Sequence, residues 1–283
     1  LDTLPVGYAY TRGRRVPLVF DAHESYPDLV APRLPRWAML ALRATERLLV
    51  PRVDALITVG DLLAGHYRRW VQRVAVVRNC QPISPESSNP EALRLEWKLD
   101  RVDLVVCYIG GFTYGRVILP LIEVIKTDPT LGLVLVGEGP QSTSLLTAAE
   151  DVDRIMYLGR RVPPDQVVSI MQGADIVYYG LRSDYPNNRF SSPNALYSAL
   201  AAGRPLLATN VGEVSLVVQA EECGVVLDEP TKESIVAGLG KLRDTKARTV
   251  MARNARHAAQ TKYNWAAAEQ ELLNLYRELW GAV

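Results

Sequence analysis

Short apolar runs alternate with amphipathic segments along most of the chain, and this rhythm constrains the fold more than any other feature. Parallel strands need long crossover connections, usually helices, so the alternation predicts an α/β fold with parallel sheets. In the first 80 residues the apolar runs lie at 16–21, 55–59 and 74–78. Beyond residue 100 they lie at 104–109, 133–136, 155–158, 176–179, 205–208 and 224–227. We expect each run to be a strand.

A linker is predicted between the two groups of runs. Residues 81–88, Gln-Pro-Ile-Ser-Pro-Glu-Ser-Ser, have no apolar periodicity and carry the residue types that favour turns and loops. The first three runs, with helical patterns at 36–50 and 61–70, make only half of a Rossmann-like domain, whereas the six later runs make a whole one. We therefore expect the N-terminal domain to be incomplete.

The C-terminal region, residues 249–280, is rich in Ala, Leu, Glu and Arg and predicts two helices that meet near residues 263–265. We therefore predict three parts: the C-terminal portion of a Rossmann-like domain at 1–80, a complete Rossmann-like domain at 81–262, and a final helix at 263–283.

Composition excludes several classes of protein. Lys and Arg number 32 against 31 Asp and Glu, so the net charge gives no reason to expect a nucleic-acid partner. No run of about eighteen apolar residues is present, which argues against a membrane-spanning helix. The three cysteines form no CxxC motif, and this fits reduced thiols in a cytoplasmic protein. The chain begins at Leu1 without a visible signal peptide, as a fragment of a longer protein would.

A glycine-rich loop follows the run at 104–109. In an open parallel sheet, ligands bind beyond the carboxyl ends of the strands, so this loop is a candidate site. Gly110 and Gly111 let backbone N–H groups approach a phosphate closely, and Arg116 could supply a charge-assisted fork. An ordinary glycine turn with a solvated arginine explains the same residues equally well.

A dense polar loop, residues 185–191, follows the run at 176–179 and leads into a helical pattern. Ser192 suits an N-cap and Pro193 suits the first helical position, so the free amides of Asn194, Ala195 and Leu196 would face an anion. A plain capped helix explains the cap, but it does not explain the polar loop.

Two shorter loops, Gly137-Glu138-Gly139-Pro140 and Leu158-Gly159-Arg160, also follow predicted strands. Their simplest interpretations are a strand-to-helix turn and surface charge, although the second could offer backbone groups to a nucleobase. No GxGxxG follows any strand, which lowers the odds of a nicotinamide or flavin enzyme.

His23 lies between Asp21 and Glu24 at the end of the first run. A lone histidine is by default structural, but a strand end is where a titratable group is useful, so we take His23 as a functional candidate. No spacing of His, Cys and carboxylates suggests a metal site, and no GxSxG nucleophile motif is present.

The order of these loops resembles the retaining glycosyltransferases of GT-B fold, of the group 1 type, which include many bacterial cell-surface polysaccharide and lipopolysaccharide enzymes. The resemblance spans nearly the whole chain. The residues that carry it are Asp21-Ala22-His23-Glu24, Tyr108-Ile109-Gly110-Gly111 with Arg116, Val136-Gly137-Glu138-Gly139-Pro140, Leu158-Gly159-Arg160, and Ser192-Pro193-Asn194-Ala195-Leu196 through Leu206.

This resemblance implies that the C-terminal domain holds a UDP-, GDP- or similar nucleotide sugar without a metal or cofactor. The N-terminal domain would supply the side for a glycan or lipid-linked acceptor, and the final helix would return to it. His23 and Arg116 would be the catalytic groups. The implied donor-binding residues are Gly110, Gly111, Glu138, Arg160, Ser192, Asn194, Ala195, Leu196 and Ser198.

The sequence departs from the family pattern at three positions. Gly111 stands where an arginine is usual in the first glycine loop, so that Arg160 or Arg189 would have to replace its charge. Phe190 and Ser198 stand where many members carry two glutamates. The last two departures leave open a catalytically degenerate nucleotide-binding scaffold. A GT-B sugar-nucleotide 2-epimerase is a separate alternative, for which the polar loop before Ser192 offers only Asp184 as an acidic group.

The stretch from Arg33 to Leu49 mixes cationic and apolar positions. Such a helix could lie on anionic lipid, which would make the protein peripheral on the inner face of the cell membrane. The alternative is an amphipathic helix that packs on the sheet with its arginines in water.

Overall fold

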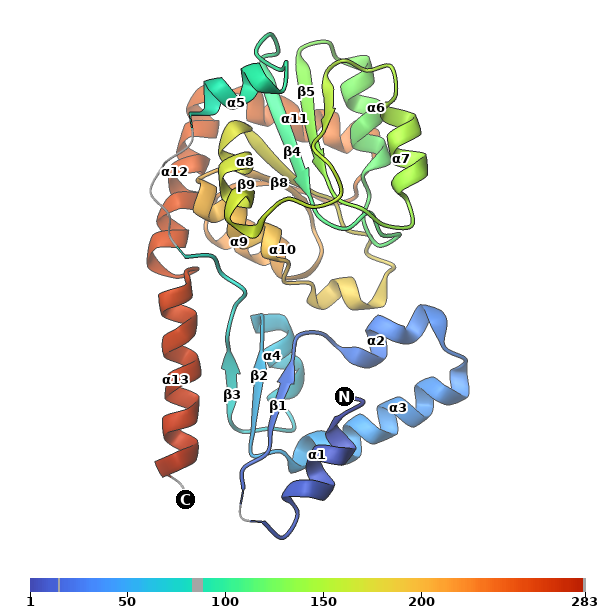
Figure 1. The fold of residues 1–283 in the computed structure, drawn as a ribbon, viewed down its shortest axis with the longest axis vertical. Coiled ribbons are helices and arrows are strands. Elements are labelled where there is room, and N and C mark those ends of the chain that lie inside the picture. The colour runs from blue at the N-terminus through green and yellow to red at the C-terminus, as the bar shows by residue number, and fades with distance from the viewer. Residues whose placement is uncertain (15, 83–88, 282–283) are drawn as a thin grey trace. The chain divides into compact units, whose positions relative to one another are not determined.

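The computed structural model describes residues 1–14, 16–82 and 89–281 and divides the chain into two compact units (Figure 1). Unit 1 comprises Leu1–Asn79, Asp184–Ser192 and the C-terminal segment from Trp265. Unit 2 comprises Cys80–Ser183 and Pro193–Asn264. Most of the predicted linker, residues 83–88, lies outside the described residues. The polar segment 184–192, which the sequence placed in the nucleotide-binding domain, packs with unit 1.

Unit 1 is built on a three-stranded parallel sheet in the order β1-β2-β3, so the α/β prediction is confirmed here. Alternate residues of β2 point to opposite faces. Leu56 packs in a cluster with Phe20 and Tyr67, whereas Ile57 packs against Leu275 and its neighbours on the final helix. The elements are α1 (Leu4–Thr11), β1 (Val19–Ala22), α2 (Tyr26–Val30), α3 (Arg36–Leu49), β2 (Ala55–Thr58), α4 (Asp61–Tyr67), β3 (Val74–Val76) and α13 (Trp265–Gly281).

Unit 2 contains a six-stranded parallel sheet in the order β6-β5-β4-β7-β8-β9. The chain proceeds outward from β4 to β6 on one side and from β7 to β9 on the other. The order therefore reverses between β4 and β7, which is the position where doubly wound sheets bind ligands. The strands are β4 (Leu104–Ile109), β5 (Leu131–Val136), β6 (Ile155–Tyr157), β7 (Ile176–Tyr179), β8 (Leu206–Thr209) and β9 (Gly224–Leu227).

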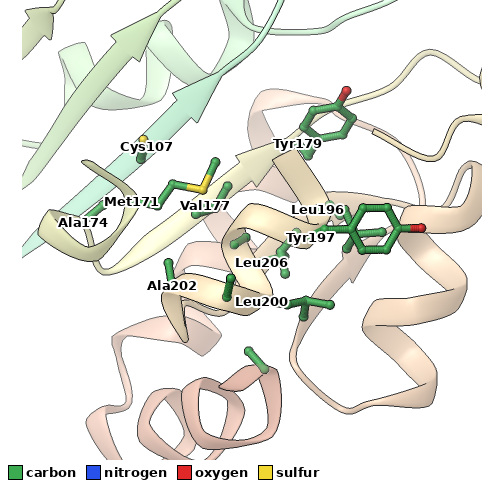
Figure 2. Packing of buried hydrophobic residues seen from close by; sticks show 14 of the residues in the cluster. Cys107, Met171, Ala174, Val177, Tyr179, Leu196, Tyr197, Leu200, Ala202 and Leu206 are labelled. Atoms are coloured by element: carbon green, nitrogen blue, oxygen red, sulfur yellow. The ribbon is translucent and has the colours of Figure 1, made fainter. Parts of the chain in front are cut away.

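Helices cover both faces of this sheet, because its strands are apolar on both sides. In β4, Val105 and Cys107 join one core cluster, while Val106 and Tyr108 join the other. Figure 2 shows the first cluster, where Leu196 and Leu200 from α9 pack near Leu206 from β8. The helices are α5 (Pro90–Glu96), α6 (Leu119–Thr127), α7 (Ser142–Ala149), α8 (Val167–Gly173), α9 (Asn194–Ala202), α10 (Gly212–Ala220), α11 (Lys232–Arg243) and α12 (Thr245–Thr261).

The three cysteines are free and buried. Burial raises the pKa of the Cys107 and Cys223 thiols to about 12, so both stay neutral and pack as small apolar side chains. Cys107 thus has the buried position expected from the apolar run around it. Among the described residues, no helix combines the length and apolar character needed to cross a membrane.

Candidate functional site

Two adjoining cavities lie in unit 2 at the carboxyl ends of its strands, next to the switch between β4 and β7. The first, of about 380 Å³, is lined by residues that follow β4, β5 and β6. The second, of about 320 Å³, is lined by residues at or after the ends of β4, β6 and β7 and by the start of α9. Both cavities share Ile109, Gly110, Val162 and Val167, so the two form one continuous surface.

Hydrogen bonds fix the glycine turn after β4 against the neighbouring loop. The Gly110 N–H donates to the Val136 carbonyl at 3.0 Å, and the Phe112 N–H donates to the Glu138 carbonyl at 2.9 Å. The Tyr108 hydroxyl donates to the Gly111 carbonyl at 2.9 Å. The glycine turn is therefore fixed by two backbone hydrogen bonds to the neighbouring loop and by the buried Tyr108 side chain.

Gly137 makes this close approach of the two loops possible. Its φ is +153°, and a Cβ at this position would lie 1.9 Å from the Gly110 carbonyl oxygen. Any larger residue would push the loops apart. The prediction of simple glycine turns missed this requirement, because it arises from contact between two separate loops.

Arg116 is positioned just beyond the glycine turn by a backbone bridge to Leu181. Its guanidinium carbon lies 4.9 Å from the centre of the Tyr179 ring, a cation–π arrangement. Tyr179 is buried and lines the second cavity, whereas Arg116 is not among the residues that line either one. Tyr179 is a site residue that the sequence did not indicate; its only signal is its place at the end of a predicted strand.

The start of α9 faces the second cavity through Asn194, Ala195 and Ser198. Within the part of the chain that is described, no acceptor pairs with the N–H groups of Asn194 and Ala195. The Leu196 N–H donates to the Pro193 carbonyl at 3.0 Å, so the expectation of a third free amide was wrong. Ser198 is buried beneath the helix start.

Ser192 does not cap this helix. Pro193 occupies the N-cap position, and the Ser192 hydroxyl donates to the Val59 carbonyl at 2.9 Å within unit 1. The serine was predicted as a cap from its place before Pro193, but a tertiary acceptor competes for its hydroxyl. Neither Ser192 nor Leu196 lines the two cavities.

The remaining donor-side candidates line the first cavity. Glu138 accepts from Arg161 Nε at 3.1 Å, while the exposed Arg160 borders the same space. Gly110 and Gly111 complete that part of the rim. Sequence reasoning missed Gln81, which lines the second cavity from within the predicted linker.

His23 lies after β1 in unit 1, with its Nε2 3.4 Å from Asp21 Oδ1 and both side chains more than half exposed. It lines neither cavity of unit 2. Phe190, one of the two departures from the family pattern, packs in unit 1 with its ring centre 5.2 Å from that of His66. Its apolar character is thus explained by local packing.

Residues 104–244 match the family model described as "Glycosyl transferases group 1". This range contains the switch point and most of the residues that line the two cavities. The chain belongs to this family. The chain is similar to the D-inositol 3-phosphate glycosyltransferase of Corynebacterium glutamicum. Their alignment of 294 positions, gaps included, has 27% identity and covers 93% of this chain and 67% of that protein. The corresponding enzyme of Corynebacterium urealyticum is 30% identical over 144 residues, covering 50% of this chain and 32% of the relative. The chain therefore spans about a third to two thirds of the length of these relatives.

The fold of this group 1 glycosyltransferase is also that of solved structures. Anabaena Alr3699/HepE in complex with UDP aligns with a TM-score of 0.78 at 18% identity, covering 98% of this chain and 76% of that one. Together with the two parallel sheets, this likeness confirms the predicted GT-B class.

Proposed function

We propose that this group 1 glycosyltransferase transfers a sugar from a nucleoside-diphosphate sugar to a hydroxyl acceptor with retention of configuration. One observation carries the proposal: the amino end of α9 and the glycine turn ahead of Arg116 border one continuous surface at the switch point of unit 2. Two unpaired N–H groups and the positive end of a helix make a site for an anion. A pyrophosphate is the anion that this family membership favours.

The two cavities suggest a division of the donor. The first, bordered by Glu138, Arg160 and the apolar Ile109, would take the nucleoside. The second would take the diphosphate on the amides of Asn194 and Ala195, with Arg116 held beside it over Tyr179. Ser198 offers a hydroxyl where related enzymes use a carboxylate, so it would make a shorter contact to the donor.

In this mechanism the enzyme stabilises the departing nucleoside diphosphate electrostatically, without a metal. The acceptor hydroxyl attacks on the face that the leaving group vacates, and the acceptor proton passes to the leaving phosphate oxygen. His23 is the candidate that contacts the sugar or orients the acceptor. HepE was solved with UDP, which makes a UDP-sugar the first donor to test.

Calorimetry with UDP and GDP tests the site directly. Asn194→Asp places a negative charge in the lining of the second cavity. The helix should still form, because an acidic side chain in the first turn of a helix is stabilising. We expect UDP affinity to fall by about tenfold, because a unit charge a few ångströms away costs about 1 to 4 kcal/mol. Gln219→Glu adds the same charge at an exposed position of α10 and should leave the affinity unchanged. Absence of nucleotide binding by the parent chain would contradict the proposal.

A second candidate, a scaffold that binds nucleotide without transfer, is favoured by the absence of acidic side chains at Phe190 and Ser198. Release of free UDP from a UDP-sugar in the presence of an acceptor lipid separates the two. UDP binding without release of UDP from the UDP-sugar, whichever acceptor is added, would support the scaffold.

We also propose that α3 contacts the inner face of an anionic membrane, where a cell-surface glycan or lipid-linked acceptor would be used. The helix leaves Trp37 and Leu40 largely exposed, at 74% and 70%, beside the basic Arg33 and Arg36. Exposed apolar side chains next to arginines suit the boundary between headgroups and acyl chains. The packed-helix alternative accounts for Leu49, which is buried, but not for these two.

Liposome flotation tests this contact. Trp37→Ser should reduce binding to anionic liposomes by about tenfold, because burial of one large apolar side chain contributes about 1.5 to 3 kcal/mol. Trp280→Ser is a matched control, since Trp280 is also 74% exposed in unit 1 but lies on α13. Equal flotation of the two variants would show that α3 does not make the contact.

A further inference from the structure

Unit 1 contains a cavity of about 200 Å³ that the proposed donor site does not use. It lies among α2, α3, the end of α4 and the short helical segment Pro186–Phe190. Its lining is strongly charged. The charged residues are four arginines and two carboxylates: Arg43, Arg47, Arg69, Arg189, Asp28 and Glu46.

Asp28 organises two of the arginines. Its carboxylate is buried, with 4% of the side chain exposed, and accepts from the Ser25 hydroxyl at 2.7 Å. It also accepts from Arg189 at 2.5 Å and from Arg43 at 3.4 Å. Asp28 therefore already accepts three hydrogen bonds, while both guanidinium groups stay more than half exposed and keep further N–H donors for a ligand.

The other charges do not balance the cavity. Glu46 is buried and accepts from the Tyr67 hydroxyl at 3.0 Å, and burial raises the pKa of its carboxyl above the ordinary value. Among the described residues, neither Arg47 nor Arg69 takes part in an ion pair. Four arginines against two carboxylates leave an excess of two positive charges.

His66 reports the same positive environment. Burial, together with the nearby Arg69 and Arg189 and partly opposed by Asp28, lowers the pKa of the His66 imidazole to about 4. The imidazole is therefore neutral at pH 7, with its ring packed against Tyr67, Trp70 and Phe190. A bound anion would stabilise the imidazolium and raise this pKa.

We propose that this cavity binds the phosphate group of a phosphomonoester. A phosphomonoester carries about −1.5 to −2 charges at neutral pH, which matches the excess of two positive charges. Planar arginine forks are the side chains best suited to phosphate oxygens. We assign this phosphate to the acceptor. The assignment rests on the proposed transfer reaction, whereas the proposal that the cavity binds phosphate does not depend on that reaction.

Inorganic phosphate is the probe that tests the site on the whole chain. Calorimetry should detect binding, and the double variant Arg47→Gln/Arg69→Gln should weaken it by about a hundredfold, roughly tenfold for each charge-assisted hydrogen bond that the substitutions remove. These two arginines are chosen because they do not hold Asp28. The matched control is Arg68→Gln/Arg73→Gln, which removes two exposed arginines of unit 1 that do not line the cavity.

A second measurement separates binding in the cavity from binding elsewhere. In the parent protein, phosphate should raise the pKa of His66 as followed by NMR, and in the Arg47/Arg69 variant it should not. UDP binding by unit 2 should be equal in both proteins, so failure of this site and failure of the donor site are distinguishable. Equal phosphate affinity in the two double variants, or no shift at His66, would overturn the proposal.

The source of the phosphate is settled by competition. Glycerol 3-phosphate that displaces inorganic phosphate supports a soluble acceptor. Vesicles with phosphatidic acid that displace it, where the soluble ester does not, support a lipid headgroup. Failure of both to compete overturns the assignment to a phosphomonoester.

Discussion

Replacing Arg116 with alanine should lower sugar transfer by the intact gene product about 10² to 10³-fold, the loss typical for one preorganised group that stabilises transition-state charge. The fold should survive, because a cation–π contact like that between Arg116 and Tyr179 contributes only about 0.5 to 1 kcal/mol where it is partly exposed. Initial rates over a range of UDP-sugar concentrations give kcat and KM. We expect the loss mainly in kcat.

Two companion variants sharpen this result. Arg116→Lys keeps the positive charge but loses the planar guanidinium, which can donate two parallel hydrogen bonds. This variant should therefore transfer sugar faster than Arg116→Ala but more slowly than the parent protein. Arg253→Gln removes an exposed arginine of α12 and should transfer sugar at the parent rate. Unchanged transfer by Arg116→Ala would remove this residue from the mechanism, and Arg160 would become the first cation to test.

Replacing Gly137 with alanine should destabilise unit 2 by roughly 3 kcal/mol and abolish most UDP binding. The added Cβ would lie 1.9 Å from the Gly110 carbonyl oxygen and 2.8 Å from the Phe112 ring. Neither the backbone nor the buried ring can move without shifting the glycine turn that borders both cavities. Denaturant unfolding followed by circular dichroism measures the stability, and calorimetry measures the binding.

Gly240→Ala is the control for this experiment. Gly240 lies inside α11, and a Cβ there would meet nothing within 4 Å. We expect stability that is unchanged or higher by about 0.5 to 1 kcal/mol, because alanine is favoured over glycine in a helix interior. If both alanine variants unfold alike, the two loops are not packed as closely as described.

The strands were predictable because buried parallel strands have apolar side chains on both faces, as in Leu104–Ile109. Their limits were less predictable: the run expected at 16–21 becomes a strand only from Val19, after Pro17, which has no N–H for a ladder. The helix Leu4–Thr11 was missed, since its side chains show almost no amphipathic pattern.

At the candidate site, the sequence indicated Gly110, Asn194 and Ala195, and these residues line the two adjoining cavities, because the topology gathers the loops after parallel strands at one edge of the sheet. It could not find the cavity around Asp28. Arg189 reaches that carboxylate across 161 residues of sequence, and no local pattern encodes such a contact. The prediction of Ser192 as a helix cap was wrong for the same reason, because the Ser192 hydroxyl donates to the carbonyl of Val59, which is distant in sequence.

The assignment of residues 184–192 to unit 1 has a practical consequence for engineering donor specificity. A hybrid made by a single crossover near Cys80 would import a foreign version of this segment and leave Asp28 without Arg189. An exchange of unit 2 should instead retain the host sequence from Asp184 to Ser192 and from Trp265 onward, so the transplanted module consists of two separate stretches.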